Sequence, residues 1–272
     1  MDSFTVVGAR GFIGGTFVRV LRERGANVRA LTHEEAAQIQ DDLGDVIYAS
    51  GVAWDAERRP HDALRAHAEV PAAILRGRLR TFTFVSSTRV YGDSAATDEE
   101  ACARVFPRDV YATTKLAGES LVLSDPRPGM RVVRLSNVYG RSYSSGLLLS
   151  DFLRQAATTN RIVVRSARDS EKDHVSVEDV VDVCLRIAVE GRHRIYNVAA
   201  GRNTLQGDIL DAIATVSGCA IDVAENAPTV RFVPIRNDRI RDEFAFHAGG
   251  ILDDIPALWE SFRAHFALQA TV

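Results

Sequence analysis

A glycine-rich turn near the N-terminus constrains the fold of this chain more than any other feature. Residues 8–14 read Gly-Ala-Arg-Gly-Phe-Ile-Gly, directly after an apolar run at 4–7 and at the start of a helical pattern that continues to about residue 24. In such a turn Gly8 permits the sharp change of direction, Gly11 lets a pyrophosphate approach the backbone, and Gly14 lets the helix lie close to the sheet. Free amides at the helix start attract an anion. The spacing therefore predicts a dinucleotide-binding turn.

Short apolar runs and helical patterns alternate through the first half of the chain. Strand patterns occupy residues 4–7, 27–31, 46–49, 81–85 and 130–135, and helical patterns occupy 12–24, 62–75 and a segment around Tyr111. This alternation is typical of a parallel sheet with helices on both faces. We predict an α/β fold in which residues 1–140 form mainly a Rossmann-type, doubly wound, dinucleotide-binding domain.

The alternation loosens after residue 140. Helical patterns at 147–157 and 177–189 are interspersed with short strand patterns at 161–165 and 195–198. We predict that residues 141–272 form mainly a smaller α/β lobe that binds the substrate, with the chain crossing between the two parts.

Composition excludes several classes of protein. A hydrophobic fraction of 46% and a net charge of −3 favour a globular protein and argue against a nucleic-acid binder. The three cysteines are far apart, so neither a disulfide framework nor a metal site is expected. The chain begins with a strand pattern and has no apolar stretch of about 18 residues. We expect a soluble, cytoplasmic protein that does not bind membranes.

The residues after the second strand pattern bear on the choice of cofactor. An acidic side chain at that place would bind the adenosine ribose of NAD, but the strand ends in Leu31, Thr32 and His33. Glu34 or Glu35 could still reach the ribose from the next turn. Arg10 offers a cation to a 2′-phosphate. We therefore favour NADP(H) and keep NAD(H) as the alternative.

A tyrosine and a lysine four residues apart indicate a site of proton transfer. Tyr111 and Lys115 share one face of a predicted helix. A free phenol has a pKa of about 10, and a cation within about 4–6 Å lowers that value by roughly 1–3 units. The spacing thus predicts an acid/base pair.

These motifs together resemble those of the extended short-chain dehydrogenase/reductases, which include nucleotide-sugar epimerases, dehydratases and ketoreductases. The resemblance is carried by the glycine turn, Ser-Ser-Thr-Arg-Val-Tyr-Gly at 86–92, the Tyr111/Lys115 pair, Arg-Leu-Ser-Asn-Val-Tyr-Gly at 134–140 and Lys-Asp-His-Val-Ser-Val-Glu-Asp at 172–179. It implies that Tyr111 is the acid/base, that Lys115 binds the nicotinamide ribose and lowers the tyrosine pKa, and that Ser87 binds the reacting oxygen. Ser86 is the neighbouring candidate for that last role.

The turn and the resemblance together assign the remaining site residues. The predicted cofactor-binding residues are Gly8, Arg10, Gly11, Phe12, Ile13, Gly14, Thr32, His33, Gly51, Lys115 and Leu135. The predicted substrate-binding residues are Ser87, Thr88, Asn137, Lys172 and Arg231, of which Lys172 lies where family members often carry an arginine for the diphosphate. A lysine keeps the charge but loses the bidentate geometry.

The sequence departs from the family pattern in two places. Only about a dozen residues separate the strand patterns at 27–31 and 46–49, so we predict one strand fewer than the usual seven. Asp41 or Asp42 would then be left to serve the adenine. His67 stands where the family usually has an asparagine, and we interpret it as a structural histidine bonded to backbone.

The residues after the candidate serine narrow the reaction. Dehydratases of the family carry an Asp-Glu pair where this chain has Thr88 and Arg89, so dehydration is not expected. We predict an NADPH-dependent ketoreductase acting on a nucleotide-activated 4-keto-6-deoxy sugar. The alternatives are an NAD-dependent nucleotide-sugar 4-epimerase and a non-catalytic NAD(P)-binding sensor. Family members commonly pair through the helices near His67 and Tyr111, so a homodimer is expected.

Overall fold

The computed structural model describes residues 3–39, 41–53, 55–143 and 146–269. The chain divides into two compact units. The first unit comprises Met1–Ser136, Val180–Val198 and Arg236–Phe246, and the second comprises Asn137–Asp179, Ala199–Ile235 and His247–Val272. Each unit is therefore assembled from three separate stretches of the chain.

A parallel sheet of six strands forms the centre of the first unit. Its order is β2-β1-β3-β4-β5-β9, with β1 at Ser3–Val7, β2 at Asn27–Leu31, β3 at Asp45–Tyr48, β4 at Thr81–Ser87, β5 at Met130–Leu135 and β9 at Ile195–Val198. All five pairings are parallel. The predicted fold class, a doubly wound parallel sheet, is confirmed.

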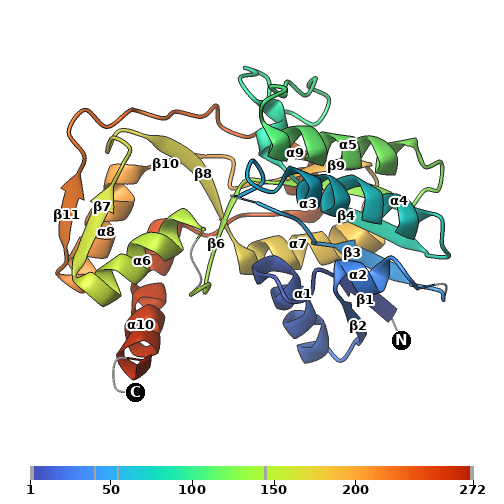
Figure 1. Cartoon of the computed structure of the whole chain (residues 1–272), viewed down its shortest axis with the longest axis horizontal. Coiled ribbons are helices and arrows are strands. Elements are labelled where there is room, and N and C mark those ends of the chain that lie inside the picture. Colours follow the sequence, from blue (N-terminus) through green and yellow to red (C-terminus); the bar gives the residue numbers. More distant parts are fainter. Residues whose placement is uncertain (1–2, 40, 54, 144–145, 270–272) are drawn as a thin grey trace. The chain divides into compact units, whose positions relative to one another are not determined.

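Helices cover both faces of this sheet (Figure 1). One face carries α1 (Phe12–Glu23) and α7 (Val177–Glu190), and the other carries α4 (Val70–Leu75) and α5 (Val110–Ser124). Of the shorter helices, α3 (Pro60–Leu64) contacts α5, α2 (His33–Ala36) contacts β2 and α4, and α9 (Asp238–Phe244) contacts β9. Burial on both sides explains why β3 and β5 are buried along their whole length rather than at alternate residues.

The strand missing from the usual seven is absent between β2 and β3. Among the described residues between these strands, only the one-turn helix α2 has regular secondary structure. As a result β2 is the edge strand of the sheet, and Asn27, Arg29 and Ala30 are exposed. The prediction of six strands is confirmed.

The helix predicted over residues 62–75 is interrupted. It consists of α3, a π-helical turn η1 (Arg65–Glu69) and α4. Pro71 lacks an N–H group, and in a regular helix its ring would clash with the carbonyl of His67. The π-helical turn removes this conflict. The freed carbonyl faces α5 so closely that a Cβ on Gly118 would lie 2.2 Å from it.

The second unit contains two small sheets and three long helices. Its three-stranded sheet has the order β10-β8-β6, and its two-stranded sheet pairs β11 with β7. These elements are β6 (Asn137–Tyr139), β7 (Arg161–Val164), β8 (Glu171–Ser176), β10 (Asn203–Leu205), β11 (Ala220–Val223), α6 (Leu148–Thr159), α8 (Gln206–Ser217) and α10 (Ile251–Gln269). Its core includes Leu153, Ile213 and Phe262, one from each helix. None of the described helices is long and apolar enough to span a membrane.

Candidate active site

The carboxyl ends of β1, β3 and β4 lie at one edge of the sheet, and the candidate site residues of the first unit follow them. Val7 is in register with Leu31 of β2 and with Tyr48 of β3, which places Gly8, Thr32 and Ala49 side by side. From β1 the chain first forms β2, which pairs with one side of β1. It later forms β3, which pairs with the other side of β1. Ligands of doubly wound sheets bind where the strand order reverses in this way.

The glycine turn has no room for side chains at two of its three glycines. Gly8 adopts a φ of 88°, and a Cβ there would lie 2.6 Å from the backbone nitrogen of Ser50. A Cβ on Gly14 would lie 2.1 Å from the Gly8 carbonyl oxygen. Gly11 is the N-cap of α1 and makes no side-chain cap, so the amides of Phe12 and Ile13 have no intrahelical partner. The turn therefore presents free N–H groups at the positive end of a helix dipole.

A cleft of about 330 Å³ opens beside this turn. Its lining consists of Gly8, Arg10, Gly11, Thr32, His33, Glu34, Ala49, Ser50 and Gly51. Backbone amides, a glycine-lined wall and one arginine suit the phosphates of a dinucleotide, so the residues present fit such a cofactor.

Two neighbouring glutamates follow β2, and they differ in whether their carboxylates can contact a ligand in the cleft. Glu35 forms a capping box with Thr32, whose N–H and Oγ1 both donate to Glu35 Oε2 at 2.7 and 2.9 Å. These bonds, led by the backbone one, lower the pKa of Glu35. Glu34 lines the cleft instead. Of the two carboxylates weighed from the sequence, Glu34 is therefore the one placed to meet a ribose.

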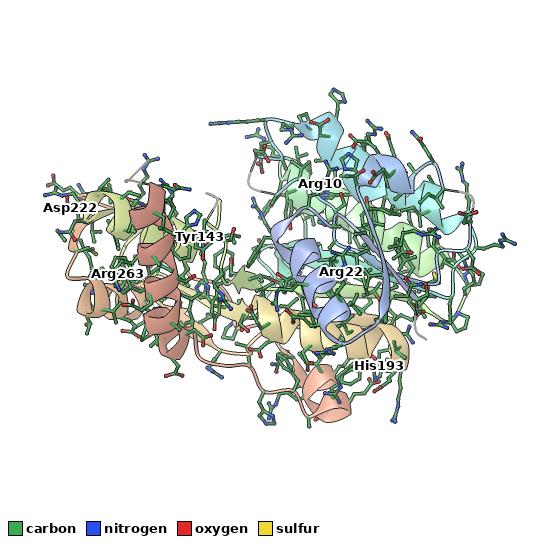
Figure 2. The ribbon with its side chains drawn as sticks, turned by 90° about the horizontal axis from the view of Figure 1, so that it is seen from below. Arg10, Arg22, Tyr143, His193, Asp222 and Arg263 are labelled. Atoms are coloured by element: carbon green, nitrogen blue, oxygen red, sulfur yellow. The ribbon has the colours of Figure 1, made fainter. Side chains whose placement is uncertain are left out.

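Arg10 lies before the first turn of α1 and is exposed (Figure 2). Its charge contributes to the lowered pKa of Glu35, but among the described residues no carboxylate forms an ion pair with it. Asp41 and Asp42 are exposed, and Asp42 accepts the Gly44 N–H in a turn rather than lining the cleft. The guanidinium of Arg10 can therefore bind an added anion without first breaking an ion pair.

The Ser87 hydroxyl lies near enough to the Tyr111 phenol to lower its pKa. Ser87 ends β4, and Tyr111 lies in the first turn of α5, which Asp109 caps by accepting the Ala112 N–H at 2.9 Å. Ser86 points elsewhere, because its hydroxyl donates to Glu119 in a buried network that includes Arg134. The geometry therefore selects Ser87 over Ser86 as the partner of the tyrosine.

Burial dominates the acidity of Tyr111. Desolvation raises the pKa of the phenol, whereas the nearby Ser87 hydroxyl and the charge of Arg89 lower it. The sequence predicts Lys115 as this cation, and in that respect the structure differs. A phenol held protonated beside a serine hydroxyl can donate a proton to an oxygen that binds between them.

Lys115 is buried on α5 with an exposed fraction of 4%. Its Nζ donates to the Val85 carbonyl at 2.8 Å, and burial lowers its pKa to about 7, with Glu119 opposing the shift. A Cβ on Gly51 would lie 3.3 Å from this Nζ. Gly51 therefore brings the cleft wall and the lysine together.

His67 is fully buried and bridges two elements of the site. Its Nε2 accepts the Val52 N–H at 3.2 Å, and its Nδ1 lies 2.8 Å from Thr114 Oγ1. Because Nε2 accepts, the neutral ring carries its proton on Nδ1 and donates it to Thr114. The ring packs edge-on against Tyr111 at 5.6 Å, and burial lowers the pKa of His67 to about 2. This is the backbone-bonded histidine that the sequence predicts.

The remaining predicted residues of the first unit lie near the end of β4. Thr88 begins the 3-10 turn η2 (Thr88–Tyr91), and Leu135 is paired with Ser87 across the sheet. Sequence reasoning missed Ala49 and Ser50 in the cleft wall. The sequence contained the information needed to predict them, because they directly follow β3 just as Gly8 directly follows β1.

Three predicted substrate residues lie in the second unit. Asn137 is exposed on β6, and its Nδ2 donates to the Asp173 carbonyl at 2.8 Å. Lys172 on β8 lies with Nζ 5.3 Å from the centre of the Phe232 ring. The backbone of Arg231 forms an isolated β-bridge with Glu171 of β8. Its guanidinium donates to Asp169 Oδ2 at 2.9 Å. Arg231 and Phe232 therefore lie beside β8, which carries Lys172.

Comparison with known proteins gives relatives that act on nucleotide sugars. The chain is 29% identical over 172 residues to the GDP-6-deoxy-D-mannose reductase of Pseudomonas aeruginosa, covering 57% of this chain and 55% of that protein. It therefore matches only about half the length of that relative. It is 26% identical over 281 residues to a dTDP-4-dehydro-6-deoxy-D-allose reductase from Streptomyces, covering 85% and 84% of the two chains.

Solved structures share the fold at low identity. A structure of RMD from Pseudomonas aeruginosa complexed with NADPH has a TM-score of 0.82 at 24% identity, covering 97% of this chain and 100% of that one. The UDP-glucose 4-epimerase of Thermotoga maritima with UDP-glucose has a TM-score of 0.83 at 17% identity, covering 97% and 99%. Together with the curated relatives and the family model, these structures confirm the resemblance to the extended short-chain dehydrogenase/reductases. The model of the NAD dependent epimerase/dehydratase family matches residues 4–199, which is more than half of this chain, so the chain belongs to that family.

Proposed function

We propose that the protein is an NADPH-dependent reductase of a nucleotide-activated 4-keto-6-deoxy sugar. The observation that carries this proposal is the partly buried Tyr111 phenol, which lies beside Ser87 and whose pKa is raised by desolvation. A protonated phenol is suited to giving a proton to a ketone oxygen, which is what reduction requires. Two curated relatives are named as reductases of 6-deoxy sugars, which supports the same direction.

The residues of the first unit divide the binding of the cofactor between them. The glycine turn and the first amides of α1 would hold its pyrophosphate, and Arg10 would hold a 2′-phosphate. Lys115 would donate to the nicotinamide ribose. When bound, NADPH supplies the hydride for the carbonyl carbon.

In this proposal the side chains of the protein carry out the proton transfer. Ser87 holds the ketone oxygen, and the Tyr111 hydroxyl gives that oxygen a proton as hydride reaches the carbon, so the product is a secondary alcohol. The tyrosinate left behind regains its proton from solvent. Lys115, with a pKa of about 7, can exchange a proton near neutrality and is on the same helix.

The second unit offers groups for a nucleoside diphosphate. Lys172 and Arg231 supply two cations around β8, and the Phe232 ring is 45% exposed beside them. Cations suit a diphosphate, and an exposed ring suits the face of a base. We assign these residues and Asn137 to the nucleotide part of the substrate.

A 4-epimerase is the second candidate, and Glu34 favours it. This carboxylate lines the cleft after β2, where an acid binds the ribose hydroxyls of NAD. An epimerase would retain NAD and return the hydride to the opposite face of the sugar.

Turnover assays separate the two candidates. The expected result is oxidation of NADPH, followed by its absorbance, in the presence of GDP- or dTDP-4-keto-6-deoxyhexoses. Product alcohols identified by mass spectrometry would establish which ketone is used. Interconversion of UDP-hexoses without net NADPH oxidation would reject the reductase and support the epimerase.

Replacing Arg10 with alanine tests the cofactor proposal. The guanidinium is expected to contribute a charge-assisted bond worth about 1.5–3 kcal/mol, so the KM for NADPH should rise roughly 10- to 100-fold while that for NADH changes about twofold or less. Steady-state kinetics with both cofactors give this comparison. Arg22, exposed at the far end of α1, provides the matched control. Equal effects of Arg10→Ala on the two cofactors would remove the argument for a 2′-phosphate.

A further inference from the structure

An ion pair borders the Tyr111 ring at the start of α5. Arg89 lies in η2, and its Nε donates to Asp109 Oδ2 at 2.7 Å. The guanidinium carbon of Arg89 lies 5.7 Å from the centre of the Tyr111 ring. The two charges come from residues 20 positions apart that meet beside one phenol.

Both members of the pair are also bonded to the site itself. Asp109 Oδ1 accepts the Ala112 N–H at 2.9 Å, so the same carboxylate caps α5 and holds Arg89. The backbone N–H of Arg89 donates to Ser87 Oγ at 3.2 Å, and the Ser87 hydroxyl lowers the pKa of Tyr111. Arg89 therefore contacts Asp109, Ser87 and the Tyr111 ring at the same time.

We propose that the Arg89–Asp109 pair is a positioning and charge-setting device that determines how readily Tyr111 gives up its proton. The inference rests on the acid role proposed for Tyr111.

The two charges act on Tyr111 in opposite directions. Arg89 lowers the pKa of the phenol and Asp109 raises it. Among the other titratable groups near the ring, His67 is neutral because burial lowers its pKa to about 2. Arg89 and Asp109 are the charged groups that shift the pKa of Tyr111. Glu57 lies 3.7 Å from the Arg89 guanidinium and is exposed.

Exposure limits the size of the effect without removing it. The Arg89 side chain is 52% exposed and that of Asp109 is 17% exposed. Exposed ion pairs are screened by water and salt. We therefore expect a change of about threefold to tenfold in proton affinity when one charge is removed, and a smaller change at high salt.

Two substitutions with opposite expected signs test the proposal. Arg89→Met removes the cation, and Asp109→Asn removes the anion while keeping a residue that caps helices well. The readout is the absorbance titration of 3,5-difluorotyrosine incorporated at position 111, because this phenol ionises closer to neutrality than tyrosine. Arg89→Met should raise the pKa of that phenol, Asp109→Asn should lower it, and Arg89→Lys should restore part of the shift.

Shifts in the same direction in both variants, or no shift in either, would overturn the proposal. Arg89→Gln and Asp109→Ser carry the same expectations if the first variants do not fold, and circular dichroism monitors folding. The titration needs no substrate, so its result is independent of the proposed reaction. A protein that titrates as expected but reduces no keto sugar would lose the proposed function and keep the charge pair.

Discussion

Tyr111→Phe is expected to lower kcat by about 100- to 10,000-fold, the usual range for loss of a general acid. The KM for NADPH should change by about twofold or less, because the substitution removes only the hydroxyl group, which lies near Ser87. Steady-state kinetics on the accepted ketone measure both constants. The retained ring still packs edge-on against His67, so the melting temperature should stay close to that of the wild type.

Ser87→Ala provides the companion variant. It removes the hydroxyl that lies near the tyrosine but leaves the proton donor, so its kcat should lie between those of the wild type and Tyr111→Phe. Retention of more than about a tenth of wild-type kcat by Tyr111→Phe would be incompatible with the acid role. Intact biological activity of that variant in cells would instead favour a cofactor-binding sensor.

His67→Asn is expected to make the free energy of unfolding depend less on pH below about pH 6.5. The pKa of the buried ring is about 2 in the folded protein, against an ordinary value near 6.5. Below pH 6.5 the unfolded chain binds a proton at this residue and the folded chain does not, so the free energy of unfolding falls as the pH falls. The slope approaches about 1.4 kcal/mol per pH unit below pH 6.5, which integrates to roughly 2.3 kcal/mol between about pH 6.5 and 4.5. Asparagine does not titrate and should remove this contribution.

Urea unfolding at about pH 7, 6 and 5 measures that slope. His61→Asn is the matched control, since His61 is exposed in the preceding helix α3 and its replacement should leave the slope unchanged. The comparison uses the difference between pH values, so an overall loss of stability from the lost Val52 or Thr114 bond does not affect it. Equal slopes for His67→Asn and the wild type would contradict the buried neutral ring.

The sheet of the first unit was predictable because its strands are encoded locally. The strand patterns at 27–31, 130–135 and 195–198 match β2, β5 and β9 residue for residue. Their apolar runs reflect burial on both faces, and the glycine turn identifies β1 by its steric requirements. The absence of a seventh strand was predictable from the short segment between the strand patterns at 27–31 and 46–49.

Other features depend on contacts between distant residues. The π-helical turn arises from Pro71, but a single proline does not indicate whether a helix will kink, end or widen. The cation beside Tyr111 is Arg89 rather than Lys115, because the fold directs Lys115 toward Val85. Sequence spacing established that Tyr111 and Lys115 share a helix, but not which charge approaches the phenol. In the second unit, three-residue strands such as β6 and β10 are too short to show a period.

The edge position of β2 has a consequence for association between copies of the chain. A strand at the margin of a sheet exposes backbone donors and acceptors that can pair with a strand from another molecule. In this protein that margin is five residues long and carries the exposed side chains of Asn27 and Arg29. A cation repels a second copy of itself and opposes such pairing. With the seventh strand absent, protection against aggregation at this margin falls largely to Arg29.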